Sequence, residues 1–114
     1  PAISWKQISG KAERHPQGGS VNKEEANAIV QELERIVNNN YNGTIGAVTP
    51  FRQQANLIRE LVFKNQRLSE QLMIRDFLVD TVHKFQGDER DIMIFSPTYT
   101  KEIHKGSEIF LSRT

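Results

Sequence analysis

Three short apolar segments that alternate with amphipathic ones constrain the fold of this chain more than any other feature. Residues 44–48 form a continuous run of small, apolar side chains between turn signals, and residues 77–82 and 92–96 form two more apolar runs. Such runs are typical of strands in a parallel sheet that is covered on both faces. Helical patterns before and after the first of these runs indicate crossover connections. The order predicts an α/β domain with a parallel sheet flanked by helices.

The first helical pattern follows residue 22. Asn22 and Glu25 have the spacing of a capping box, in which the Asn oxygen accepts a free helix amide and the Glu reaches back. Apolar side chains then recur at helical spacing and predict a buried stripe, with Glu32, Glu34 and Arg35 facing outward. The stripe comprises Ala26, Ile29, Val30, Leu33, Ile36 and Val37. Residues 38–43 are predicted to end the helix as a turn.

The second helical pattern starts directly after residues 44–48. Thr49 is a good N-cap and Pro50 suits the first helical position, so a tight turn from strand to helix is expected there. The inward side chains of that helix are predicted to be Ala55, Ile58, Leu61 and Val62. Residues 64–75 are interpreted as a separate short helix.

The ends of the chain give weaker patterns. Residues 3–8 alternate apolar and polar side chains and predict a first strand. Residues 10–20 and 99–106 are interpreted as surface loops, and residues 109–111 as the beginning of a further element. The Gly18-Gly19-Ser20 run lacks the Lys followed by Ser or Thr that a phosphate-binding loop requires, so a flexible connection is the simpler interpretation.

Composition limits the function classes. A chain of 114 residues is one domain, and a net charge of +1 excludes a strongly basic nucleic-acid binder, so any nucleic-acid contact is expected to be local. The absence of cysteine excludes disulfides and thiolate chemistry. No apolar stretch reaches the roughly 18 residues that span a bilayer, and residues 1–5 lack the charged and apolar regions typical of a signal peptide. We therefore expect a cytoplasmic domain without a membrane partner. The missing initiator Met suggests a piece of a longer protein.

Polar residues 81–91 lie between two predicted strands, where strand ends open into a crevice that commonly binds ligands. Gly87 lets the backbone approach a ligand or adopt a positive φ. Gln86 offers both a donor and an acceptor, and Glu89 offers an acceptor. This set suits the recognition of hydroxyl and amide groups. A polar turn without a function is the alternative interpretation.

Two further groups could contact a sugar-phosphate backbone. Thr81 and His83 straddle a predicted strand end, where a hydroxyl and an imidazole can reach phosphates. Residues 49–54 place a hydroxyl, helix N-terminal amides and the Arg52 side chain at the mouth of the second predicted strand, and helix N-termini attract phosphates. A structural histidine and a capped helix start are the alternatives.

Several chemistries are excluded. The three histidines are far apart in sequence and have no cysteine partners, so no metal site is predicted. Ser96 lacks the elbow motif of a hydrolytic nucleophile. Asp88 and Glu89 follow a glycine in a turn and do not end an apolar strand, which argues against Mg²⁺ binding. A nuclease built on aspartates lacks a suitably spaced lysine. No catalytic residue is therefore predicted.

Taken in order, two motifs resemble a known family. Gly-Ala-Val-Thr-Pro-Phe-Arg-Gln-Gln (46–54) is similar to the Thr-Pro-aromatic turn of superfamily 1 helicases, and Thr-Val-His-Lys-Phe-Gln-Gly-Asp-Glu-Arg-Asp (81–91) resembles their motif V. The resemblance covers nearly the whole chain. It is to the second RecA-like motor domain, in the branch that includes the nonsense-mediated-decay helicase and its bacterial relatives. It implies a P-loop NTPase-like domain 2 that lacks the P-loop.

The resemblance also implies roles for individual residues. Glu89 would contact the nucleotide near its ribose or phosphates, with Gln86 and Gly87 lining the same inter-domain cleft. Single-stranded nucleic acid, DNA in preference to RNA, would be contacted by Thr49, Pro50, the Phe51 amide, Thr81 and His83. The family often has Asp at the His83 position and Arg at the Asp88 position, so the charge at the strand mouth differs here.

Phosphoryl transfer to water needs a phosphate-cradling loop with its Lys, a carboxylate for Mg²⁺ and a charge-stabilising Arg. This chain supplies none of them, and the family's arginine motifs do not occur in it. We therefore expect residues 1–114 to be one domain, a fragment of an ATP-dependent helicase that stops before the downstream arginine motif and is inactive alone. ATP and Mg²⁺ would be held mainly by the other RecA-like domain of the parent. The alternative is a non-catalytic nucleic-acid-binding or adaptor module.

Overall fold

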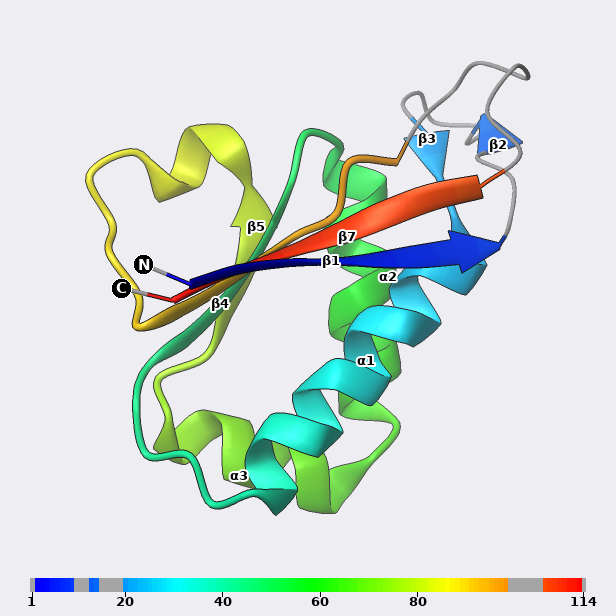
Figure 1. Cartoon of the computed structure of the whole chain (residues 1–114). Helices are drawn as coiled ribbons and strands as arrows, with labels where there is room; N and C mark the ends of the chain where they lie inside the picture. The colour runs from blue at the N-terminus through cyan, green and yellow to red at the C-terminus, as the bar shows by residue number, and fades with distance from the viewer. Residues whose placement is uncertain (1, 10–12, 15–19, 99–105, 114) are drawn as a thin grey trace.

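The computed structural model describes the backbone of residues 2–9, 13–14, 20–98 and 106–113, and the side chains of residues 21–98. Three helices, a short 3-10 helix and seven strands make up this part of the chain (Figure 1). In chain order they are β1 (Ala2–Ser9), β2 (Glu13–Arg14), β3 (Ser20–Val21), α1 (Lys23–Asn38), β4 (Ile45–Thr49), α2 (Arg52–Phe63), α3 (Gln66–Ile74), β5 (Leu78–Thr81), η1 (Val82–Phe85), β6 (Ile92–Phe95) and β7 (Gly106–Arg113).

The main sheet has five strands in the order β1-β7-β6-β4-β5. β4 pairs in parallel with both β5 and β6, which confirms the predicted parallel sheet for these three strands. β7 pairs antiparallel with β6 and β1, and the predicted element at residues 109–111 is the middle of it. β2 and β3 form a second, two-stranded sheet within the predicted loop 10–20, so that prediction is wrong for residues 13–14 and 20. The rest of that loop, and residues 99–105, lie outside the described residues.

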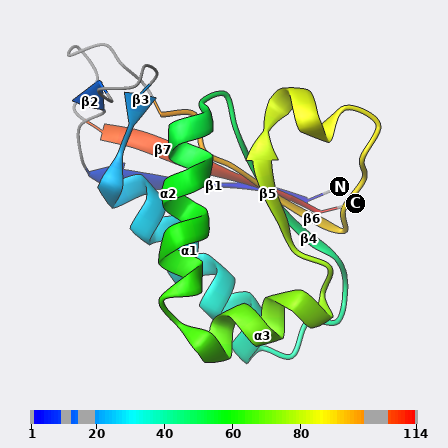
Figure 2. The same cartoon turned by 180° about the vertical axis from the view of Figure 1, so that it is seen from behind.

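The three helices cover one face of the sheet (Figures 1 and 2). The connections from β1 to β4 and from β4 to β5 cross the sheet in the same direction, so right-handed crossovers place α1, α2 and α3 on the same side. The connection from β5 to β6 returns in the opposite direction, and η1 lies on the other side. Gly46 faces η1, because a Cβ built on it would lie 2.9 Å from the Phe85 ring.

The hydrophobic core lies between the three helices and the face of the sheet that they cover. Its strand residues include Ile45, Ala47, Val79, Ile92 and Ile94, and its helix residues include Ala26, Ile29, Leu33, Ile58, Val62, Leu68 and Leu72. The predicted α1 stripe is confirmed, with Val30 partly buried. Glu32 does not face outward as predicted. Its carboxylate is buried against Arg35 at 2.7 Å, which compensates its charge.

The start of α2 differs from the prediction. Thr49 is the last residue of β4, and the N-cap is Phe51, in an extended conformation with φ −116° and ψ 126°. Thr49 Oγ1 accepts a hydrogen bond from the Phe51 amide at 3.4 Å, which closes a local turn in place of a helix cap. Pro50 therefore lies in the turn and is not the first helical residue. α3 is a separate short helix, as predicted.

Two strand ends are also shorter than predicted. β5 ends at Thr81, and Val82 belongs to η1. β6 ends at Phe95, so Ser96 follows the strand. Within the described part of the chain, no helix combines the length and the apolar character that crossing a membrane requires.

Candidate nucleic-acid interface

The carboxyl ends of β4 and β5 lie side by side, with Thr49 paired to Thr81 in the parallel register. The chain continues from β4 into the turn at residues 50–51 and from β5 into η1, so two segments 32 positions apart in sequence meet at one edge of the sheet. A wide hollow of about 640 Å³ opens between them. It is lined by Pro50, Arg52, Thr81, Val82, His83 and Gln86.

This hollow unites residues from both predicted sets. Pro50, Thr81 and His83 come from the set predicted to contact nucleic acid, and Gln86 comes from the set predicted to contact a nucleotide. Arg52, which the resemblance left without a role, adds a guanidinium at the first residue of α2. A hydroxyl, an imidazole, a guanidinium and a helix N-terminus are all groups that contact phosphate oxygens.

Thr49 and Phe51 lie differently from the other predicted contacts. Thr49 is fully buried, and its Oγ1 accepts from the Phe51 amide. The Thr49 hydroxyl is therefore not on the surface of the hollow, and the Phe51 N–H already has an acceptor. In this arrangement both residues shape the turn that presents Pro50 and Arg52.

The predicted nucleotide residues form an exposed turn after η1. Gly87 has φ +79°, and a Cβ built on it would have no atom within 4 Å. Glycine is therefore favoured here by the backbone conformation and not by crowding. Gln86 and Glu89 are exposed. These side chains suit the hydroxyl and amide groups of a sugar or base, and none of them is a cation that could neutralise a phosphate.

Arg90 holds this turn in place, which the sequence did not indicate. Its side chain is only 11% exposed, and its guanidinium lies 2.9 Å from the Asp88 carboxylate and 2.9 Å from the Asp76 carboxylate. Asp91 accepts from the Thr44 amide at 2.8 Å. These aspartates are engaged in structural contacts, and no cluster of metal-binding side chains occurs among the described residues.

A buried polar network joins the start of α1 to the residues that follow β6. Glu25 is fully buried, and its Oε1 accepts from the Ser96 hydroxyl and from the Thr98 amide, the latter at 3.1 Å. The predicted capping box is therefore only half correct. Asn22 caps α1 by accepting from the Glu25 amide at 2.9 Å, but the Glu25 carboxylate turns away toward β6. Glu25 looked like an ordinary capping residue in the sequence, so no signal pointed to its burial.

Comparison with known proteins gives one family match and several relatives. The model of the AAA domain family AAA_12 matches residues 1–113. The chain is 34% identical over 94 residues to the probable helicase DDB_G0274399 of Dictyostelium discoideum, covering 78% of this chain and 9% of that protein.

Two further relatives are also helicases. The chain is 31% identical over 93 residues to helicase sen1 of Schizosaccharomyces pombe, covering 78% of this chain and 5% of that protein. It is 31% identical over 93 residues to the uncharacterized ATP-dependent helicase MG140 of Mycoplasma genitalium, covering 73% of this chain and 8% of that protein. The chain thus spans less than a tenth of the length of these relatives.

Proposed function

This chain belongs to the AAA_12 family of AAA domains found in superfamily 1 helicases, and we propose that it forms part of the second RecA-like motor domain of an ATP-dependent helicase. It contacts single-stranded nucleic acid, DNA in preference to RNA, through the hollow at the ends of β4 and β5. It adds Gln86, Gly87 and Glu89 to an ATP cleft. The phosphates and Mg²⁺ are held by the other RecA-like domain.

One observation carries this proposal. Pro50 and Arg52 come from the turn after β4, Thr81 and His83 come from the end of β5, and all of them line one hollow together with Gln86. The Gln86 amide donates to the His83 carbonyl at 3.4 Å, so the nucleotide-side and strand-side residues belong to one short turn.

The same turn suggests how the two ligands are coupled. Phe85 is buried and its ring lies beside Gly46, so one contact anchors to the sheet the short turn that carries both His83 and Gln86. A change in the position of Gln86 when the ATP cleft closes would therefore shift His83 along the bound strand. Coupling of this kind requires that nucleotide and strand favour the same position of the turn.

Fluorescence anisotropy with a labelled single-stranded DNA tests the strand contact. Arg52→Ala should weaken binding and reduce the slope of log affinity against log salt by about one, because one phosphate contact is lost. Arg67→Ala is the matched control, since Arg67 carries the same charge on α3, outside the hollow. Equal losses in the two variants would mean that only net charge matters. A parallel titration with single-stranded RNA tests the preference for DNA.

The nucleotide contact is tested in the intact helicase. Glu89→Ala should lower ATP turnover more than strand affinity, and His83→Ala should do the reverse. A non-catalytic adaptor would bind strands with an affinity that is independent of ATP. That result would favour the alternative function and contradict the motor assignment.

A further inference from the structure

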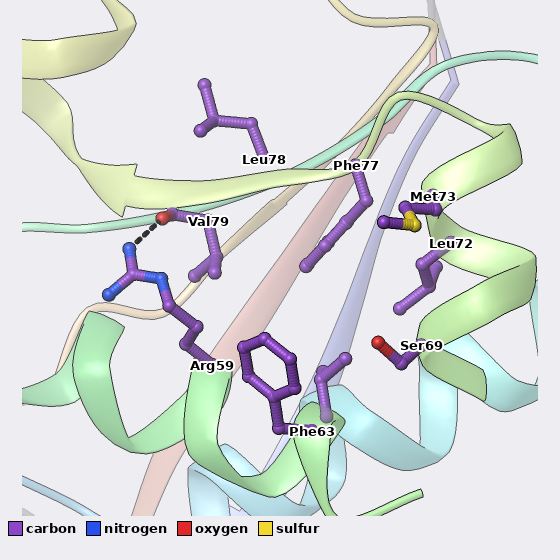
Figure 3. A pocket seen from close by; sticks show the side chains of 9 residues that line it. Arg59, Phe63, Ser69, Leu72, Met73, Phe77, Leu78 and Val79 are labelled. Carbon is purple, nitrogen blue, oxygen red and sulfur yellow. Dashed lines mark hydrogen bonds between the residues drawn. The ribbon is translucent and has the colours of Figure 1, made fainter. Parts of the chain in front are cut away.

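A second, apolar pocket lies away from the proposed strand interface, between α2, α3 and β5 (Figure 3). Its volume is about 220 Å³, and it shares no lining residue with the first hollow. Val62, Leu72 and Val79 are the buried residues of its lining. Figure 3 shows the Phe63 and Arg59 side chains rising from α2 on one side and Met73 approaching from α3 on the other.

The rim of this pocket exposes large apolar side chains to solvent. Phe63 is 72% exposed and Met73 is 77% exposed, and both line the pocket. Ile74 follows Met73 and is 75% exposed, but it does not line the pocket and is not part of this rim. Gathered exposed apolar side chains around a concave site are typical of surfaces that bind a partner.

The volume of the pocket selects the size of the group that fills it. Pockets for drug-sized ligands measure roughly 300 to 1,000 Å³, whereas a cavity of roughly 150 Å³ already admits benzene. A pocket of about 220 Å³ therefore suits one aromatic side chain and is too small for a cofactor.

The neighbouring strand is closed to a partner strand. β5 is the outermost strand of the sheet, but the Val79 carbonyl accepts from the Arg59 guanidinium and the Thr81 amide donates to Asp80 Oδ1 at 2.7 Å. Because these backbone groups are occupied, addition of an extended segment to this edge is disfavoured. A helix, which inserts side chains and needs no backbone pairing, fits the site better.

The charge at the pocket determines which charged residue is favoured beside the aromatic side chain of the partner. Arg59 is the single ionisable residue of the lining, and its side chain is 40% exposed. Its guanidinium donates to Asn56 Oδ1 at 2.8 Å and to the Val79 carbonyl, and Asp80 lies 3.9 Å away, so its other N–H groups can donate to a closer carboxylate. An acidic residue beside the aromatic anchor is therefore favoured over a basic one.

We propose that this pocket docks an acidic amphipathic helix of a partner protein, which inserts one aromatic side chain between α2 and α3 and places a carboxylate beside Arg59. The proposal does not depend on helicase activity, because it rests on the pocket alone.

A fluorescein-labelled amphipathic peptide of about 15 residues tests it, with one Trp and with a Glu one helical turn away. Anisotropy should show saturable binding to this chain, and Phe63→Ser should weaken it roughly ten-fold, as expected for a residue that contacts a buried anchor. Ile74→Ser is the matched control, because Ile74 is equally exposed but does not line the pocket, and it should leave the affinity unchanged. Both substitutions are at exposed positions and should leave the fold intact.

Peptide variants test the two stated features separately. Trp→Ala in the peptide should abolish binding. Glu→Lys in the peptide should weaken binding to the unmodified chain, whereas the Glu and Lys peptides should bind the Arg59→Gln variant equally. Equal binding of the Ala peptide, or equal losses with Phe63→Ser and Ile74→Ser, would overturn the proposal. Sedimentation that shows self-association of this chain, lost in Phe63→Ser, would identify a second copy as the occupant and would also overturn it.

Discussion

Gln54 binds both backbone groups of Asn22, a residue 32 positions earlier in the chain. The Asn22 amide donates to Gln54 Oε1 at 2.9 Å, and Gln54 Nε2 donates to the Asn22 carbonyl at 3.0 Å. Gln54 Nε2 also lies 3.3 Å from Ser96 Oγ, at the end of β6. One buried side chain thus joins the start of α1 to the start of α2, next to the turn that presents Pro50 and Arg52.

Gln54→Ala should therefore destabilise the domain. The substitution removes two buried hydrogen bonds to the Asn22 backbone, each worth about 0.5–1.5 kcal/mol, whereas the Asn22 carbonyl keeps the Ala26 amide as a donor at 3.0 Å. Urea unfolding measures the change in the free energy of unfolding. Gln31→Ala, at an exposed position of α1, is the control and should change it by less than about 0.5 kcal/mol. Similar effects of the two substitutions would show that the Gln54 contacts contribute nothing beyond helix propensity.

Glu25 holds Thr98 in a conformation that is unusual for a β-branched residue. Thr98 has φ +52°, and both its amide and its hydroxyl donate to Glu25 Oε1, at 3.1 and 3.2 Å. We expect Glu25→Ala to release Thr98 from this conformation, because the partner that offsets its backbone strain is lost. Hydrogen exchange should show loss of protection at the Thr98 amide.

The neighbouring residue Glu24 provides the control for this experiment. Glu24→Ala removes the same charge from the same helix turn at an exposed position. It should leave the exchange rate of the Thr98 amide unchanged. If Thr98 stayed protected in Glu25→Ala, another contact would have to hold its conformation.

Local patterns in the sequence predicted the parallel strands and the helices because their residues encode them directly. The apolar run at residues 44–48 and the stripe from Ala26 to Val37 each require only one periodicity. The pairing of β7 with β6 and β1 could not be predicted in this way, since a strand order depends on contacts between distant segments. Pairing of β1 with β7 joins residues at opposite ends of the chain.

The candidate site could likewise be predicted only where neighbouring residues in the sequence encode it. Thr81, His83 and Gln86 lie in one motif, and the register of β4 and β5 brings Pro50 to them, as expected for neighbouring parallel strands. The burial of Thr49 and the network of Glu25 were not predictable. Thr and Glu are also common as exposed helix caps, so their residue types do not indicate burial. Glu25 turns inward because of contacts with the residues that follow β6.

Gly46 sets the distance between η1 and the sheet. A Cβ at this position would lie 2.8 Å from Met93 Sδ and 2.9 Å from the Phe85 ring. Gly46→Ala should destabilise the domain by about 1–3 kcal/mol, the usual cost of overpacking, and should weaken strand binding because η1 carries His83. Chemical unfolding and the DNA titration measure the two effects.

A second substitution tests whether crowding causes the loss. Met93→Ala frees space beside the added methyl group, so the cost of Gly46→Ala should be smaller in that background. Strictly additive effects in this double-mutant cycle would contradict the crowding account.

Arg90 should stabilise the Gln86–Glu89 turn, and its loss should cost more stability than the loss of an exposed arginine elsewhere. Arg90 contacts Asp88 through two guanidinium nitrogens, at 2.9 and 3.2 Å, and also contacts the carboxylate of Asp76, two residues before β5. Arg90→Gln leaves the partly buried Asp88 without its ion pair, and we expect a loss of about 1–3 kcal/mol in the free energy of unfolding. Limited proteolysis should cut this turn faster in the variant.

Arg67→Gln, which removes an exposed hydrogen bond to Asn38, should change stability by less than about 1 kcal/mol. A loss in Arg67→Gln as large as that in Arg90→Gln would show that the ion pairs of Arg90 do not order the turn.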